Sequence, residues 1–138
     1  QGVKNSYNSP DSINAIDWTY KTQYKDRVDY YAGLAAIRHA HPGFCLGDAA
    51  LVREKLEFIE VDDPCVVAFR ITGLEGIDSG KSLTVLLNGS KKNVKVEIPK
   101  GNYTVLAKDG KADADGLNAY SGSTISASAT SATILAEN

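Results

Sequence analysis

VKVEI, residues 94–98, alternates apolar and charged side chains, as a β-strand with one buried face does. Similar short runs of β-branched and aromatic residues recur after residue 44, and Gly, Asp, Asn and Pro separate them. Many short strands with turn signals between them predict an antiparallel β-sandwich. The strands are expected near 55–61, 65–72, 82–88, 93–98, 102–108, 124–128 and 132–136.

The part of the chain before these strands has a different character. Residues 1–17 contain turn-forming residues without sustained periodicity, whereas residues 25–41 have the spacing of an amphipathic helix, with Asp26 as a cap or first-turn acid. A loop and one such helix cannot bury an apolar stripe alone, so residues 1–42 are expected to end a larger, helix-containing body. The expected stripe consists of Val28, Tyr30, Tyr31, Leu34, Ala35 and Ile37.

Composition excludes several classes of function. The chain has 138 residues, of which 43% are hydrophobic, enough for a domain with its own core. A net charge of -2 and a pI near 5.6 provide no broad basic surface, so neither nucleic acid nor an acidic membrane is an expected partner. No run reaches the roughly 18 apolar residues of a membrane span. The start also lacks a signal-peptide pattern, so either there is no signal or the natural N-terminus lies upstream.

Two patterns resemble metal sites without fitting one. Asp109–Gly116 looks like a calcium loop, but Lys111 and Gly122 then fall at positions one and twelve of an EF-hand, where acidic residues are needed. His39 and His41 are two residues apart on the expected helix and so point to different sides. No metal and no cofactor are therefore expected.

Two further groups of residues are expected to be structural. Cys45 and Cys65 lack CxxC spacing and a nearby histidine, so they are expected to be small buried residues, with a disulfide between them left open. A local lysine cluster is expected on the solvated face of a hairpin. It consists of Lys91, Lys92, Lys95 and Lys100.

Four stretches carry a family resemblance: YNSPDSINAIDW (7–18), VDYYAGLAAIRHAHPGF (28–44), LVREKLEFIEVDDPCVVAFRITG (51–73) and SATSATILA (128–136). Together they resemble the C-terminal part of bacterial type I pullulanases, which are debranching enzymes of the α-amylase superfamily, glycoside hydrolase family 13. The resemblance implies a (β/α)8 catalytic barrel followed by a Greek-key β-sandwich. Residues 1–43 would then be the loop after the last barrel strand and the final barrel helix, and residues 44–138 the sandwich.

The resemblance also implies an activity that this chain does not carry by itself. Such enzymes hydrolyse α-1,6-glucosidic linkages of pullulan, starch or glycogen with an aspartate nucleophile and a glutamate acid/base. The motifs that hold these carboxylates lie upstream in the family and do not occur in this sequence. Asp11 and Asp17 share one loop, whereas the catalytic residues of a barrel come from several strands. We therefore expect no catalytic residue here, an inactive fragment and a structural role.

Sugar recognition is the expectation for the first loop. A glucan presents hydroxyls that donate and accept hydrogen bonds, which suits amides and carboxylates, and its apolar face packs on aromatic rings. By resemblance the substrate-binding residues are Tyr7, Asn8, Asp11 and Asn14, and the partners are an α-glucan and the missing barrel. The alternative is that these residues only hold the loop in shape. Trp18 is expected in a core.

A rival interpretation is a stand-alone carbohydrate-binding or structural β-sandwich module. Beyond residue 43 the sequence offers few aromatics for such a binding face and no Trp, and Phe58 and Phe69 are expected in the core. Extracellular or cell-surface localisation is implied by the resemblance alone.

Overall fold

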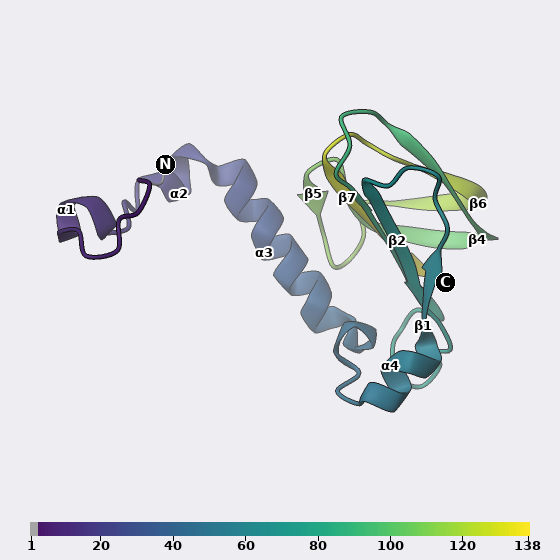
Figure 1. Ribbon diagram of the computed structural model, residues 1–138. Coiled ribbons are helices and arrows are strands. Elements are labelled where there is room, and N and C mark those ends of the chain that lie inside the picture. Colours follow the sequence, from purple (N-terminus) through teal and green to yellow (C-terminus); the bar gives the residue numbers. More distant parts are fainter. Residues whose placement is uncertain (1–2) are drawn as a thin grey trace.

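Helices precede strands along this chain, and the computed structural model describes residues 3–138 (Figure 1). The helices are α1 (Asp11–Asn14), α2 (Tyr20–Gln23), α3 (Lys25–Ala40), the 3-10 helix η1 (Pro42–Cys45) and α4 (Ala49–Lys55). The strands are β1 (Leu56–Ile59), β2 (Val66–Ile71), β3 (Ser82–Asn88), β4 (Val94–Lys108), β5 (Lys111–Ala112), β6 (Asn118–Ala127) and β7 (Ser131–Glu137). Among the described residues, none belongs to a helix that is both long and apolar enough to cross a membrane.

The strands form one antiparallel sheet in the order β1-β2-β3-β7-β4-β5, with β6 also paired to β4. The last strand, β7, thus lies between β3 and β4. The sheet curls so that Val66 and Leu86 from one half share a core with Val96 and Ile125 from the other. This arrangement confirms the predicted class, a mainly antiparallel β-fold preceded by helices, although the two layers belong to one continuous sheet.

Several element bounds differ from those predicted. The strands expected at 93–98 and 102–108 are one strand, β4, which bends at an irregularity between Glu97 and Gly101. Tyr103 stabilises this bend, because its ring lies over Gly101 and its hydroxyl donates to the Pro99 carbonyl at 2.6 Å. Pro99 and Gly101 made the segment look like a break in the strand.

A short helix was missed between the predicted helix and the first strand. Asp48 caps α4, because its carboxylate accepts hydrogen bonds from the backbone N–H groups of Ala50 at 2.7 Å and Leu51 at 3.0 Å.

Two strands also differ from those predicted, since β6 begins at Asn118 rather than near residue 124, and β5 had no predicted counterpart. Asp109 and Gly110, both with positive φ, form the tight turn that brings β5 back against β4.

Helix α3 has nearly the predicted bounds, but its apolar stripe is not one face. Leu34 and Ile37 pack on the outer side of the sheet, where a second core contains Ile71, Leu83 and Ala136. Tyr31 and Ala35 are exposed instead. They lie along the flank of the helix, about 100° around the axis from the residues that touch the sheet.

Gly33 sets the distance between α3 and the sheet. A Cβ atom on Gly33 would lie 2.2 Å from the carbonyl oxygen of Ala112 in β5, which is far inside van der Waals contact. The helix can approach the β4–β5 hairpin this closely only because residue 33 has no side chain.

Replacing Gly33 by valine is therefore expected to lower the free energy of unfolding by about 1–3 kcal/mol, since overpacking at a contact costs about that much. Ala32→Val is the matched control, because Ala32 is exposed on the same helix and the substitution introduces the same side chain. Urea unfolding followed by circular dichroism measures both changes. Equal effects of the two substitutions would show that the close approach at Gly33 contributes nothing.

Two predictions of burial were wrong in the part of the chain that follows α3. Phe58 is 71% exposed, because it lies on the outer face of the sheet beyond the part that α3 covers, whereas Phe69 is half-buried and packs against the second core. Cys45 and Cys65 are exposed free thiols rather than buried residues. Cys45 ends η1 and Cys65 stands in the turn before β2, so neither side chain is on a strand face that points into a core.

Candidate functional site

The N-terminal arm, residues 3–24, holds all four residues that the sequence predicted to bind substrate, and it projects away from the sheet (Figure 1). Asn14 Nδ2 lies 2.9 Å from the Ser6 carbonyl oxygen and 3.0 Å from that of Ser9. Asn5 and Asn8 adopt left-handed backbone conformations, with φ of 57° and 83°, which Asn tolerates better than most residues. These features fold the first part of the arm into a tight loop that ends in α1.

The four predicted residues have different surroundings in this loop. Tyr7 is 92% exposed, and Asn8 and Asp11 are exposed as well. Within residues 3–138 the side chains of these three make no hydrogen bond. Asn14 instead uses its amide to hold the loop, which is the structural role left open for it above. The loop therefore exposes a phenol ring, an amide and a carboxylate within residues 7–11, a combination that suits a hydroxyl-rich ligand.

Asp17 and Trp18 lie at the junction between α1 and α2. Asp17 Oδ1 accepts hydrogen bonds from the Thr19 hydroxyl at 2.6 Å and the Thr19 N–H at 3.0 Å, and these bonds lower the pKa of Asp17. Asp17 thus forms a turn. The prediction of Trp18 as a core residue was wrong, because Trp18 is 72% exposed. The arm does not fold back onto the sheet, so the described residues provide no core for this indole.

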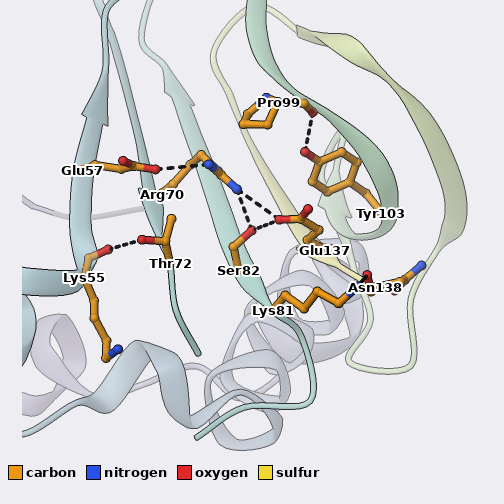
Figure 2. A network of polar contacts seen from close by, with 10 residues as sticks. All are labelled: Lys55, Glu57, Arg70, Thr72, Lys81, Ser82, Pro99, Tyr103, Glu137 and Asn138. Carbon is orange, nitrogen blue, oxygen red and sulfur yellow. Dashed lines mark hydrogen bonds and ion pairs between the residues drawn. The ribbon is translucent and has the colours of Figure 1, made fainter. Parts of the chain in front are cut away.

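A polar network inside the curled sheet could be mistaken for a pair of catalytic carboxylates (Figure 2). Arg70 Nη1 lies 3.1 Å from Glu57 Oε1, and Arg70 Nη2 lies 3.1 Å from Glu137 Oε2. Ser82 Oγ accepts from Arg70 at 2.9 Å and donates to Glu137 at 2.5 Å. Both carboxylates are thus engaged by one guanidinium, and the network joins the neighbouring strands β1, β2, β3 and β7. Its role is structural.

The sequence did not predict a buried polar contact at the end of α3. His41, just after α3, has its Nδ1 atom 2.8 Å from Asp78 Oδ1, and both side chains are almost completely buried. Asp78 also accepts hydrogen bonds from the N–H groups of Gly43 at 2.9 Å and Gly80 at 3.0 Å. The two residues are 37 positions apart, and no local pattern connects them. The contact fastens the end of α3 to the loop between β2 and β3.

The remaining sequence motifs lie at the surface. Asp113 in the DGKADADG segment accepts a hydrogen bond from the N–H of Asp115, which is a local turn contact. Across residues 3–138, no three His, Cys, Asp or Glu side chains gather in a group that could hold a metal ion. The lysine cluster is exposed, and Lys92 pairs with Asp63 at 3.2 Å in the turn that leads into β4.

Comparisons with known proteins point to one group of enzymes. Residues 52–111 match the family model described as pullulanase, all-beta domain. The pullulanase of Bacillus subtilis (strain 168) is 36% identical over 99 residues, which are 72% of this chain and 14% of that protein. The match to the family model begins within α4 and ends at the start of β5, so it covers strands β1 to β4.

Solved structures extend the similarity to nearly the whole chain. The pullulanase from Bacillus acidopullulyticus superimposes with a TM-score of 0.86 at 29% identity, over 98% of this chain and 16% of that one. The type I pullulanase from Bacillus subtilis str. 168, complexed with maltose, gives 0.85 at 30% identity, over 99% and 19%. The chain thus spans less than a fifth of the length of these relatives.

Proposed function

Since this chain belongs to the pullulanase family, we propose that it is the noncatalytic C-terminal part of a debranching glycoside hydrolase that cleaves α-1,6-glucosidic linkages of pullulan, starch or glycogen. In this proposal the chain lacks the catalytic carboxylates, and residues 1–43 end the catalytic domain while residues 44–138 form the β-domain. Helix α3 seats the β-domain on the catalytic part, and the N-terminal arm contributes to the rim of the substrate site. The maltose bound to the Bacillus subtilis enzyme supports an α-glucan as the ligand of the complete protein.

One observation carries the structural part of this proposal: helix α3 has two apolar sides. Leu34 and Ile37 face the sheet, and Gly33 allows the close approach. A second row, at intervals of three and four residues, runs along the flank of the helix and includes exposed positions. Its members in α3 are Val28, Tyr31 and Ala35, and Tyr24 precedes them at the N-cap. A helix with two apolar sides is suited to lie between two packed bodies, and this chain provides only one of them.

The arm supports the second part of the proposal. It carries apolar residues, among them Ile16 and Trp18, that are each 72% exposed. Apolar side chains at this density are expected to contact a further protein surface. If the catalytic part covers them, the adjacent Tyr7, Asn8 and Asp11 are held at its edge, where substrate binds in barrel enzymes.

The first experiment compares this chain with a polypeptide that also includes the residues encoded upstream of Gln1. The longer polypeptide is expected to release reducing sugar from pullulan, and this chain alone is expected to release none. Hydrolysis of pullulan by the purified 138-residue chain would contradict the proposal. An upstream sequence without paired acidic residues on a barrel would contradict the assignment of the parent as a glycosidase.

The second experiment tests the rim. In the longer polypeptide, Tyr7→Ala is expected to lower kcat/KM for pullulan about tenfold, because an aromatic contact is worth roughly 1 kcal/mol or slightly more. Val3→Ala is the matched control, since Val3 is also exposed on the arm. Reaction rates over a range of pullulan concentrations give both values. An unchanged kcat/KM for Tyr7→Ala would remove Tyr7 from the substrate site.

The 138-residue chain also tests the rival function, a stand-alone carbohydrate-binding module. Maltotriose added to the 138-residue chain would then shift the backbone amide signals of a patch on the sheet in an NMR titration. Of the aromatic residues after residue 43, only Phe58 is largely exposed, so the β-domain offers no row of exposed rings for stacking on a sugar. We expect no such patch.

A further inference from the structure

An apolar patch lies on the outer face of the sheet, next to the area covered by α3. Phe58 is 71% exposed, Val67 48% and Leu87 45%, and the half-buried Phe69 lies among them. The strand register makes them neighbours, since Phe58 pairs with Phe69 and Val67 pairs with Leu87. The rings of Phe58 and Phe69 are in edge-to-face contact, 6.3 Å between centroids. These four residues are called the sheet patch below.

The sheet patch and the helix-covered area belong to one surface. Phe69 pairs with Val85 and Ile71 pairs with Leu83, and residues two apart on a strand point to the same face. The sheet patch and the residues beneath α3 therefore lie on the same face of the sheet. A groove between the helix and the sheet is lined by Tyr30 of α3 and by Leu87 and Ala132 near the strand ends. Helix α3 therefore covers one part of a continuous apolar face and leaves the adjoining part exposed.

We infer that the sheet patch is a second contact surface for the catalytic part of the enzyme, separate from the flank of α3. This inference rests on the proposed function. It is supported by the continuity of the patch with the face on which α3 packs, and by the length of the relatives, of which this chain spans less than a fifth. An exposed cluster with two phenylalanines is an unusual surface for a domain that has no neighbour.

Two contacts have a mechanical consequence that one contact does not. With the flank of α3 alone, the β-domain could pivot about the helix axis. A second surface on the sheet fixes the β-domain against the catalytic part. The patch thus determines the orientation of the β-domain rather than its attachment.

Cys65 provides a reporter for this surface. It stands two residues before Val67, and its carbonyl accepts a hydrogen bond at 2.9 Å from the N–H of Gly89, two residues after Leu87. Its thiol is exposed and free. The experiment uses Cys45→Ser protein, so that a maleimide reagent reads Cys65, in the 138-residue chain and in the longer polypeptide, with any upstream cysteines likewise replaced.

In the longer polypeptide, Cys65 is expected to react at least about tenfold more slowly than in the 138-residue chain, because labelling then requires local opening. Phe58→Glu is expected to restore fast labelling there, since it puts a charge into the contact. Ile77→Glu is the matched control, because Ile77 is also an exposed apolar residue but lies outside the patch. This control is expected to leave Cys65 protected.

Three outcomes would overturn the inference. Equal labelling in both polypeptides, with the longer one active on pullulan, would leave the proposed function intact and remove the second contact. Protection of Cys65 that Phe58→Glu does not relieve would assign the protection to another surface. Slow labelling of the 138-residue chain that depends on its concentration, with a dimer in analytical ultracentrifugation, would assign the patch to a second copy of this chain.

Discussion

Asp78→Ala is expected to lower the free energy of unfolding by about 3–5 kcal/mol, because removing one partner of a buried pair leaves the others without compensation. The Asp78 carboxylate is fully buried and lies 2.8 Å from His41 Nδ1. It also accepts the N–H groups of Gly43 and Gly80. In the variant these three donors face an apolar methyl group. The change is measured by urea unfolding at neutral pH, with the end of α3 expected to lose amide-exchange protection first.

Two variants serve as controls for this prediction. Asp78→Asn keeps one accepting oxygen and is expected to lose less stability than alanine. Ser79→Ala changes the exposed neighbouring residue and is expected to alter stability by less than about 0.5 kcal/mol. A loss below about 1 kcal/mol for Asp78→Ala would mean that the contact between His41 and Asp78 contributes little to the free energy of unfolding.

The same carboxylate gives stability a defined dependence on pH. Burial by itself would raise the pKa of Asp78, but the hydrogen bonds from Gly80, His41 and Gly43 outweigh it and hold that pKa below its ordinary value of 3.8. The folded state therefore favours the ionised form. The contribution is complete above about pH 4 and is lost as pH falls through the lowered pKa. Below pH 4 the parent chain should lose stability more steeply than Asp78→Asn.

Asn88→Ala is expected to cost roughly 2–4 kcal/mol, since several buried groups lose their partner and each such loss costs about 1–3 kcal/mol. Asn88 Nδ2 lies within 3.1 Å of the carbonyl oxygens of Lys92, Ala127 and Ser128. Asn88 Oδ1 accepts hydrogen bonds from the N–H and the hydroxyl of Ser90. One buried side chain thus joins the turn after β3 to the turn after β6.

Two substitutions make this prediction specific. Asn88→Asp is isosteric but places a carboxylate oxygen against carbonyl oxygens, so at neutral pH it should destabilise at least as much as alanine. Asn93→Ala removes a single exposed contact, to the N–H of Ala129, and is expected to cost less than about 1 kcal/mol. Thermal unfolding compares all three variants. If Asn88→Asp is as stable as the parent, the amide nitrogen makes no significant contribution.

Local pattern was enough for the elements whose signal lies within a few residues. The i, i+3, i+4 spacing predicted a helix over residues 25–41, one residue longer than α3, and runs of β-branched and aromatic residues between turn signals predicted β2, β3 and β7 to within one residue of their bounds. The prediction of two strands in place of β4 was wrong, because the local signal there was misleading. Pro99 and Gly101 suggested two strands, but the Tyr103 ring bridges the bend and keeps β4 continuous.

In the candidate site, too, the sequence predicted some features, and others depended on the tertiary structure. The composition of residues 5–18 indicated a sugar-binding loop, and exposed Tyr7, Asn8 and Asp11 are compatible with it, but the use of the Asn14 amide within the loop depends on three-dimensional contacts. Trp18 and Phe58 are apolar, and apolarity alone predicted burial. Burial requires a surface to pack against, and the position of that surface is not a local property.

The sequence by itself therefore determined the order of helix and strands, the antiparallel class and the family, because each depends on side chains that are neighbours along the chain. Only the tertiary structure decided that α3 has two apolar sides, that His41 meets Asp78 and that Asn88 joins two turns. These contacts connect positions separated by about 40 residues, and they depend on how the sheet curls and where Gly33 lets the helix approach it. The physical reason is that periodicity specifies which face of an element is apolar, whereas packing specifies what that face meets.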